Sequence, residues 1–490
     1  MKKNLKKLTI LHSNDLHGDF LAEKVDEKLV GGVSRLSGYI NKARNEEKNV
    51  IYAIAGDMFR GSLIDSEYQG ISTIQIMNLL APDVASLGNH EVDYGLAHLL
   101  FLERCANFPI ICANMYVKYI GKRLFSSHWI KEIDGMRVLF IGILTQEVLA
   151  KTKNEELIGT LIDLEDAVTE VGKICDTYRT TDIDFTVLLT HIGFEEDKKL
   201  AAALDPVWGV DVIIGGHSHT LLSEPCVVAG IPIVQAAIGT DQIGRFDIMV
   251  DTDNNCIDSY TWQCITITDD NCPRDEAIEE VISGYKKLTD EKYGRVLTRF
   301  PLAYTHPRRN METELGGLMA EGIRESLGDD LVLLASGSVR KPELGPIVTL
   351  MDYMEIFPFK DRMYSFKLTG AQLRHAIQFM LRDEAFVEGA HCEWYQMSRG
   401  FFCEYDRPTR RMLSLKMNGR EVGDDDVFTV AMEGYHFKSI ADFLDVRPDE
   451  IENNGKPLEV ATNEANVLQE YFSSHEHLEI DGEQRLIIHE

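Results

Sequence analysis

The chain has 490 residues, with 79 acidic side chains against 50 basic ones and a formal net charge of −29. Apolar residues make up 44% of the sequence, which is ordinary for globular domains with sizeable cores, and the length predicts two or three domains. The acidic balance disfavours nucleic-acid polymers and anionic membranes as partners. An anionic substrate must therefore be small and held by a local positive cluster or by metal ions.

The nine cysteines are odd in number and contain no Cys-x-x-Cys pair, which indicates reduced thiols rather than a disulfide framework or a zinc ribbon. The apolar run behind the basic start at residues 1–7 is too short for a signal peptide. The longest uncharged stretch, Pro225–Thr240, contains two prolines and two glycines and does not predict a transmembrane helix. We therefore expect a cytoplasmic protein.

Up to about Ile267, apolar strand-like runs alternate with amphipathic segments, which predicts a layered α/β domain. The expected strands are Val50–Ala55, Pro109–Cys112, Arg137–Leu144, Phe185–Thr190, Val210–Ile214, Ile231–Ala236 and Phe246–Val250. The expected helices lie near Val33–Arg44, Ser72–Leu80, Leu96–Cys105, Asp163–Tyr178 and Glu195–Leu204.

The pattern changes at Asp275–Leu288, where apolar residues recur at helical spacing behind Pro273. We interpret this segment as a connector helix. The predicted domains are then residues 1–270 and 294–490, joined by residues 271–293.

The second domain begins with a strand-like run, Val296–Tyr304, which is followed by a helix near Leu315–Leu327. A further helix is predicted to begin at Thr369, because Thr369 and Gln372 have the spacing of a capping box. We expect this domain to be α/β as well.

The first apolar run, with Leu8, Ile10 and Leu11, predicts a strand whose carboxyl end carries Asp15 and His17. Alternate residues of an extended chain point to the same side, so the two side chains could face one metal ion. An isolated Asp-x-His is more often turn chemistry than a ligand pair. The Asp-x-His motif therefore supports a metal site only if the rest of the chain supplies the other ligands.

Four later polar sets also follow predicted strands, and each could project to the same edge of a sheet. They are Gly56-Asp57, Gly88-Asn89-His90-Glu91 with Asp93, Thr190-His191, and Gly215-Gly216-His217-Ser218-His219. The candidate ligands are then Asp15, His17, Asp57, Asn89, His191, His217 and His219. This inventory suits two divalent ions a few ångströms apart, and its nitrogen donors favour Zn, Mn, Fe or Co over Mg or Ca. Any single histidine is more often a core residue than a metal ligand. An ordered set in which every member follows a predicted strand is much less easily explained by chance, so the set as a whole favours a metal site.

This ordered set resembles the calcineurin-like metallophosphoesterase family, whose full motif pattern spans the first half of the chain. The resemblance implies a layered sandwich of two sheets flanked by helices, with Asp57 bridging two metal ions. The remaining ligands would divide into Asp15, His17 and His219 for one ion and Asn89, His191 and His217 for the other. Two metals lower the pKa of a bridging water, so hydroxide becomes available to attack a phosphoester near neutral pH.

The resemblance also implies a role for His90 beside the metals. Oriented by Asp93, it would lie over the phosphate as a general acid or electrostatic stabiliser.

Together with these motifs, the second half of the chain resembles the C-terminal substrate domain of the 5′-nucleotidase, UDP-sugar hydrolase and 2′,3′-cyclic phosphodiesterase family. The resemblance is carried by Arg308-Arg309, the segment Ala335–Arg340, Phe357-Pro358-Phe359 and Glu433-Gly434-Tyr435. It implies that Arg309 and Arg340 contact anionic groups and that Phe359 and Tyr435 stack on a base. The sequence departs from the family where Phe437–Phe443 replaces a Gly-Gly-Asp-Gly segment.

The leading prediction is a metal-dependent phosphohydrolase of nucleotide catabolism, most simply a 5′-nucleotidase acting on a small nucleotide. A 2′,3′-cyclic nucleotide phosphodiesterase and a UDP-sugar hydrolase are alternatives built from the same parts. The net charge disfavours a nuclease, and the presence of His90 and Asp93 beside the ligand set disfavours a non-catalytic nucleotide-binding module.

Overall fold

The computed structural model describes residues 3–25, 28–146, 162–387, 392–480 and 482–489. The chain divides into two compact units, Met1–Thr289 and Asp290–Glu490. The division falls inside helix α8, Glu276–Tyr293. The apolar residues Ile278 and Ile282 of this helix are buried in the core of the first unit.

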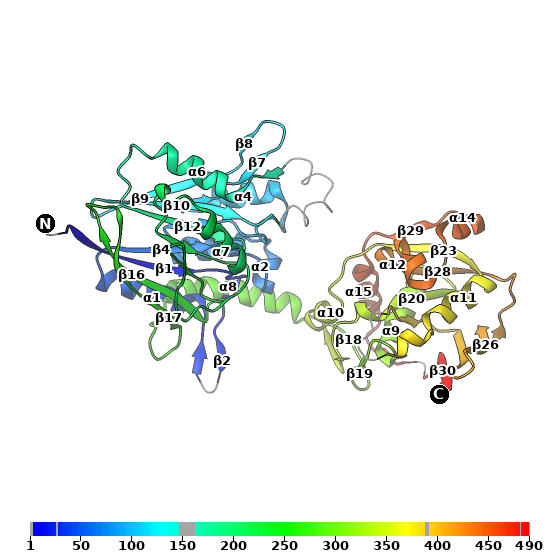
Figure 1. The fold of residues 1–490 in the computed structure, drawn as a ribbon. Helices are drawn as coiled ribbons and strands as arrows, with labels where there is room; N and C mark the ends of the chain where they lie inside the picture. Colours follow the sequence, from blue (N-terminus) through cyan, green and yellow to red (C-terminus); the bar gives the residue numbers. More distant parts are fainter. Residues whose placement is uncertain (1–2, 26–27, 147–161, 388–391, 481, 490) are drawn as a thin grey trace. The chain divides into compact units, whose positions relative to one another are not determined.

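The first unit contains two six-stranded sheets (Figure 1). The first sheet has the order β17 (Cys256–Thr266), β16 (Gln242–Asp251), β1 (Leu5–Ser13), β4 (Val50–Ala55), β5 (Val84–Ser86) and β6 (Ile110–Ile111). The second has the order β14 (Cys226–Val228), β15 (Ile231–Val234), β13 (Val212–Ile214), β12 (Phe185–His191), β10 (Met136–Leu144) and β9 (His128–Ile133). Strands β1, β4, β5 and β6 run parallel, as do β10, β12, β13 and β15.

The two sheets pack face to face because their strands are apolar on both sides, the pattern of strands buried on both faces. In β4, Ile51 and Ala53 join a core shared with Val187 and Leu189 of β12 in the other sheet. The intervening residue Tyr52 faces the opposite way, into a core formed with helices. The predicted sandwich with helices on its outer faces is confirmed.

The helices of the first unit cover the outer faces of the two sheets. On the first sheet lie α1 (Val33–Glu46), α3 (Ile71–Leu80) and α4 (Leu96–Cys105), with α2 (Leu63–Glu67) before α3; on the second lie α6 (Ala167–Thr177) and α7 (Phe194–Ala203). Small sheets join β2 (Glu23–Val25) to β3 (Lys28–Val30), and β7 (Met115–Val117) to β8 (Lys122–Arg123) and β11 (Ile162–Leu164).

The second unit is built on a five-stranded and a four-stranded sheet. The larger has the order β24 (Tyr395–Met397), β20 (Leu331–Ala335), β28 (Val427–Glu433), β23 (Met363–Thr369) and β29 (Leu458–Ala461). The smaller has the order β27 (Arg420–Glu421), β26 (Arg411–Met417), β25 (Phe401–Asp406) and β30 (Leu486–His489). Two further pairs are β18 (Val296–Arg299) with β22 (Ile347–Thr349) and β19 (Tyr304–Thr305) with β21 (Glu343–Leu344).

Helix α11 (Gly370–Met380) contributes to a core that the five-stranded and the four-stranded sheet share. Leu373 and Ile377 of the helix are fully buried there with Leu333 of β20 and Leu415 of β26. The helices of this unit are α9 (Glu314–Leu327), α10 (Leu350–Ile356), α11 (Gly370–Met380), α12 (Gly434–Lys438), α13 (Ile440–Leu444), α14 (Pro448–Asn454) and α15 (Glu464–Ser474).

Several predicted elements differ from the structure in their bounds, and two of the differences change the kind or number of elements. The run Val296–Tyr304 forms two short strands rather than one, because Pro301 lies between them and has no backbone N–H for a ladder. The helix predicted from Asp163 begins at Ala167, where Asp166 caps it, and Ile162–Leu164 forms strand β11.

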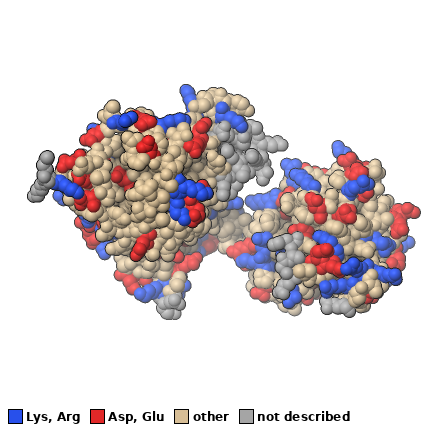
Figure 2. All heavy atoms as spheres, viewed as in Figure 1, with Lys and Arg blue, Asp and Glu red and all other residues tan. Residues whose placement is uncertain are grey.

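In the described part of the chain, no helix is both long and apolar enough to cross a membrane. All nine cysteines lie in that part, and each is a free thiol. Figure 2 shows acidic and basic side chains intermixed on the visible face of each unit.

The predicted capping box at the start of α11 is confirmed. The Thr369 hydroxyl accepts the Gln372 backbone N–H at 3.2 Å, and the Gln372 side chain accepts the Thr369 N–H at 2.8 Å. These bonds satisfy two donors that the first helical turn would otherwise leave open.

Thr369→Ala should therefore lower the local stability of α11 by about 1 kcal/mol. Hydrogen–deuterium exchange of peptides covering α11 measures this, with faster exchange expected in the variant. Thr369→Ser keeps the hydroxyl and is the control. Equal protection in the Ala and Ser variants would contradict a role for the cap.

Candidate functional site

The predicted ligand residues meet where the carboxyl ends of parallel strands from both sheets converge. The prediction of one sheet edge is therefore too simple: β1, β4 and β5 belong to the first sheet and β12 and β13 to the second. The face-to-face packing of the sheets brings these ends together. The residues delivered there are Asp15, His17, Asp57, Asn89, His191, His217 and His219.

Asp15 and His17 reach the site by a different conformation from the extended one that their spacing predicts. Their φ angles are 52° and 49°, in the left-handed region. The chain leaves β1 at Ser13 and turns, with the Asp15 N–H donating to Gly56 O at 3.1 Å and the His17 N–H to Asp57 O at 2.9 Å. The two side chains still come within 3.9 Å of each other, from His17 Nε2 to Asp15 Oδ1.

One group of donor atoms is formed by Asp15, His17 and His219. The Nε2 atoms of the two histidines are 3.3 Å apart, and His219 Nε2 lies 3.4 Å from Asp15 Oδ1. The ligand atoms of these three residues all lie within 4.8 Å of one another. This is the spacing of side chains that can share one cation.

A second group is formed around Asn89 and His191. Asn89 Oδ1 is 3.2 Å from His191 Nε2 and 2.6 Å from His217 Nδ1. Asp57 Oδ2 lies 3.1 Å from His191 Nε2 and 3.8 Å from His17 Nε2. Asp57 thus lies between the two groups, at the position of a bridging ligand.

The tautomers of two histidines show why this cluster fits metal ions. His191 Nδ1 lies 2.9 Å from Ala55 O, and His17 Nδ1 lies 3.1 Å from Arg60 O. A backbone carbonyl only accepts, so both rings carry a proton on Nδ1, and Nε2 is the nitrogen that faces the site. Nitrogen and oxygen atoms that face one another at 3–4 Å repel unless a proton or a metal ion lies between them. The donor set therefore fits divalent metal ions.

Glu91 organises the loops that carry the ligands, and the sequence analysis gave it no role. Its fully buried carboxylate accepts the backbone N–H groups of Asp57 at 3.1 Å, Met58 at 2.7 Å and Gly88 at 2.7 Å. Burial, with the Asp57 carboxylate, raises the pKa of Glu91 to about 8. Its place directly after Asn89-His90 was the only available signal.

Gly56 is required where the site is tightest. Its φ is 76°, and a Cβ there would lie 2.5 Å from Nδ1 of His191. Any side chain would displace the imidazole from its carbonyl partner on β4. The glycine before Asp57 thus lets strands of the two sheets approach at this point.

The electrostatic field of the cluster favours positive charge. Burial opposes the charged form of His191, but Asp57 and Asp15 outweigh it and raise its pKa to about 9. Burial likewise opposes ionisation of Asp57, yet His191 and the His90 backbone N–H lower its pKa below the ordinary range. A buried site that holds carboxylates ionised attracts cations.

His90 lies beside the ligands and is held by Asp93. Its Nδ1 is 2.6 Å from Asp93 Oδ2, and its backbone N–H donates to Asp57 Oδ1 at 2.8 Å. The His90 and His17 rings pack edge to face, with their centroids 5.2 Å apart. Arg60 Nε, which the sequence analysis did not single out, lies 3.5 Å from Asp93 Oδ2. The Asp93 contact places a proton on Nδ1 and directs proton exchange to Nε2.

The four residues predicted to contact substrate line one cavity of the second unit, of about 520 Å³. They are Arg309, Arg340, Phe359 and Tyr435. Of the two phenylalanines in the Phe357-Pro358-Phe359 segment, Phe357 is 1% exposed and belongs to the core, whereas Phe359 is 42% exposed. Tyr435 is 64% exposed. Two flat rings therefore border the cavity and remain accessible.

The arginines are placed by the local chain. A Cβ at Gly337 would lie 1.9 Å from Arg309 Nη2, so a side chain there would push the guanidinium from its present position. The Arg340 guanidinium lies 5.6 Å from the Phe359 ring centroid. Guanidinium groups held in this way can bind anionic oxygens. The buried acids Glu433 and Glu464 also line this cavity, and the sequence analysis assigned no role to either.

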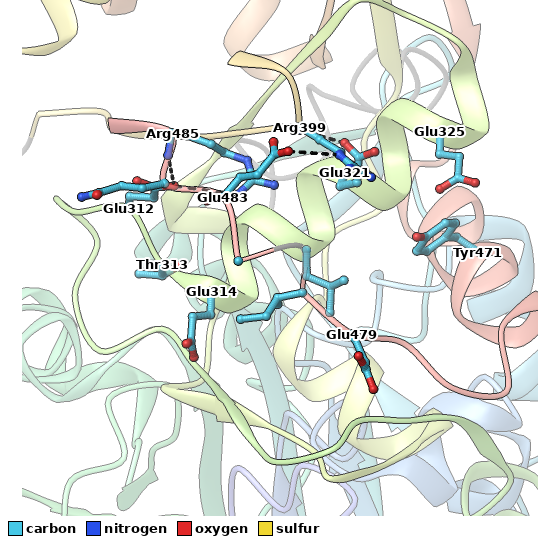
Figure 3. A pocket seen from close by; sticks show the side chains of 14 residues that line it. Glu312, Thr313, Glu314, Glu321, Glu325, Arg399, Tyr471, Glu479, Glu483 and Arg485 are labelled. Carbon is cyan, nitrogen blue, oxygen red and sulfur yellow. Dashed lines mark hydrogen bonds and ion pairs between the residues drawn. The ribbon is translucent and has the colours of Figure 1, made fainter. Parts of the chain in front are cut away.

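A second hollow of about 340 Å³ lies near α9 and α15 in the second unit (Figure 3). Its acids hold the chain in place: Glu312 accepts the Arg485 and Leu486 backbone N–H groups, and Glu321 accepts that of Arg399. These carboxylates serve to anchor the C-terminal segment and the turn before β25.

Comparisons with known families agree with this geometry. Residues 8–221 match the family described as calcineurin-like phosphoesterase, and residues 294–444 match the family described as 5′-nucleotidase, C-terminal domain. The fold and the donor cluster therefore define a phosphoester hydrolase that uses divalent metals. Residues 8–221 therefore form a calcineurin-like phosphoesterase domain, and residues 294–444 form a 5′-nucleotidase-type C-terminal domain.

Individual relatives cover most of the chain. Mouse 5′-nucleotidase is 26% identical over 461 residues, which are 84% of this chain and 77% of the relative. The endonuclease YhcR of Bacillus subtilis is 26% identical over 463 residues, which are 87% of this chain but only 37% of the relative. The crystal structure of a Thermus thermophilus 5′-nucleotidase precursor shares the fold, with a TM-score of 0.62 at 22% identity over 99% of both chains.

Asp57→Asn should lower the number of divalent ions bound and weaken the remaining affinity at least about tenfold, because a neutral amide bridges two cations poorly. Metal analysis of the protein after loading with Mn²⁺ and gel filtration measures this. Asp269→Asn, at an exposed position outside the cluster, is the control. Full metal content in the Asp57→Asn variant would show that Asp57 is not a ligand.

Proposed function

We propose that the protein is a metal-dependent 5′-nucleotidase that removes phosphate from small nucleotides. The observation that carries the proposal is the convergence of seven ligand-type side chains beside the His90–Asp93 pair. Two ions would be held by Asp15, His17 and His219 and by Asn89, His191 and His217, with Asp57 between them. The mixed nitrogen and oxygen donors favour Zn, Mn, Fe or Co.

When bound, a pair of divalent ions supplies an activated water and neutralises charge on the phosphate. The protein's own part is to hold the reacting groups and to move a proton. Asp93 fixes the His90 ring through Nδ1, so Nε2 is the atom that delivers a proton to the leaving oxygen. The His90 backbone N–H also fixes Asp57, which couples the acid to the metal ligands.

The cavity of the second unit is proposed to recognise the nucleoside part of the substrate. Phe359 and Tyr435 would stack on the base, and Arg309 and Arg340 would contact anionic oxygens. Base–aromatic stacking contributes about 1–3 kcal/mol per base and tolerates several bases. Relatives named 5′-nucleotidase support this substrate class.

Two related substrates are alternatives, namely 2′,3′-cyclic nucleotides and nucleotide sugars. A relative in Bacillus subtilis is named trifunctional nucleotide phosphoesterase and is 26% identical over 488 residues. This relative supports the proposal that more than one of these nucleotide substrates could be hydrolysed. One relative is named an endonuclease, but the charge of −29 disfavours a polyanion, so we predict no activity on nucleic-acid polymers. A role in nucleotide catabolism and a cytoplasmic location also stay predictions.

His90→Ala should lower kcat for a nucleotide by about 10²- to 10⁴-fold while the bound metal stays unchanged, because the proton donor is lost and the ligands are not. Steady-state kinetics and metal analysis of the same sample measure both quantities. His375→Ala, an exposed histidine of α11 paired with Asp445, is the control. Unchanged kcat in the His90→Ala variant would remove His90 from the mechanism.

The substrate class is tested by phosphate release in Mn²⁺ from AMP, UMP, 2′,3′-cyclic AMP, UDP-glucose, a single-stranded oligonucleotide and an aryl phosphate. We expect kcat/KM for the monophosphates to exceed that for the aryl phosphate at least about tenfold, since only a nucleotide offers a base to the aromatic pair. Preference for the cyclic nucleotide or UDP-glucose would select that alternative. Turnover of the aryl phosphate alone would contradict a nucleotide substrate.

A further inference from the structure

The cavity of about 520 Å³ in the second unit contains a buried acid whose carboxyl is incompletely satisfied. Glu464, the first residue of α15, lines the cavity and is 1% exposed. Its Oε2 atom has no hydrogen-bond partner within the part of the chain that the structure describes. A buried polar atom without a partner is costly, so it points to a group that occupies the cavity in the working protein.

Glu433, at the end of β28, lines the same cavity and is in the opposite situation. It accepts the Ala335 backbone N–H at 3.2 and 3.1 Å, through its two oxygens, and the Ser338 hydroxyl at 2.8 Å. These donors favour the carboxylate and partly offset burial, which still raises the pKa of Glu433 to about 7. Glu433 is therefore the member of the pair that holds the negative charge.

The other acid is then held neutral. Burial, together with the Glu433 and Asp361 carboxylates, raises the pKa of Glu464 to about 9. Two carboxyl groups in one buried site disfavour each other's ionisation, and Glu464 has weaker support for its charge than Glu433: the Asp361 backbone N–H favours its charged form, but Oε2 has no partner among the described residues. A neutral carboxyl carries an O–H group, so Glu464 places a hydrogen-bond donor in the wall of the cavity.

The ligand must therefore bring an acceptor. Next to Glu464 an anionic acceptor such as phosphate is disfavoured, because Glu433 holds negative charge there, whereas Arg309 and Arg340 remain the contacts for anionic oxygens in this cavity. The exposed rings of Phe359 and Tyr435 border the same space and suit a flat heteroaromatic group. A purine offers both properties, since its ring nitrogens present in-plane lone pairs.

We propose that the Glu464 carboxyl turns its O–H group toward the cavity and donates a hydrogen bond to an acceptor nitrogen of a purine base held against Phe359 and Tyr435. The inference rests on the proposed function and deepens it, because it names the residue that makes the cavity selective for the base. Glu433 positions this donor by keeping the negative charge on itself. Stacking alone tolerates any base, whereas a buried donor rejects a base that leaves it unpaired.

The test measures binding of nucleosides to the full chain by isothermal titration calorimetry. The probes are adenosine and its 1-deaza, 3-deaza and 7-deaza analogues, each of which replaces one ring nitrogen with C–H. The wild-type protein should bind one analogue about 10- to 100-fold more weakly than adenosine. Glu464→Met should bind adenosine as weakly as the wild type binds that analogue and should not distinguish the two.

Glu464→Gln keeps a donor of similar shape and should retain the preference to within about threefold. Glu470→Gln, an exposed acid on the same helix α15, is the matched control and should behave as wild type. Unfolding curves for each variant verify that the cavity is intact.

Several outcomes would overturn the inference. They are absence of adenosine binding to the wild type, equal affinity for adenosine and all three analogues, and undiminished discrimination in the Glu464→Met variant. If instead 2′,3′-dideoxyadenosine loses affinity and Glu464→Met abolishes that loss, the acceptor is a sugar hydroxyl and the base assignment is wrong. Nucleoside binding needs no hydrolysis, so a protein that binds adenosine through Glu464 but leaves AMP intact contradicts the proposed function alone.

Discussion

The structure of the first unit depends on the close approach of nitrogen and oxygen atoms that repel one another unless a proton or a metal ion lies between them. His17 Nε2 and His219 Nε2 face each other at 3.3 Å, and His191 Nε2 lies 3.2 Å from Asn89 Oδ1. Such an arrangement persists only if the surrounding chain holds it firmly. Backbone carbonyls on β4 and after it fix the imidazole tautomers, and Glu91 fixes the loops that bear Asp57 and Asn89. The fold thus stores a geometry that only cations complete.

Much of the fold could be predicted because hydrophobic periodicity is a local property of the chain. The strand Val50–Ala55 and the helix Leu96–Cys105 have the bounds that their apolar patterns predict, and the cap at Thr369 has the predicted partner. The expected strand from Val296 failed because Pro301 interrupts an otherwise apolar run. The ligand motifs were recognisable because each follows a strand, but the left-handed backbone at Asp15 cannot be read from residue spacing.

The residues missed in the second unit had no such local signal. Glu464 stands at a helix start where an acid is ordinary, and Glu433 ends a strand where an acid is also common. Only the tertiary fold brings these two acids to the same cavity as Arg309 and shows that one of them is satisfied and the other is not. Long-range burial of polar groups is a property of the packed chain, and single-sequence patterns do not contain it.

The hydrogen bond from His191 to Ala55 O has a consequence beyond catalysis, because it joins the last residue of β12 to the last residue of β4. Each of the two ligand groups also draws side chains from both sheets. Bound ions would link the two sheets of the sandwich. Because such ions bind only the folded state, they would raise the free energy of unfolding of the first unit by mass action. The melting temperature of the first unit would then rise with the concentration of free divalent metal ions. The second unit has no residue among these ligands and would keep its own melting behaviour.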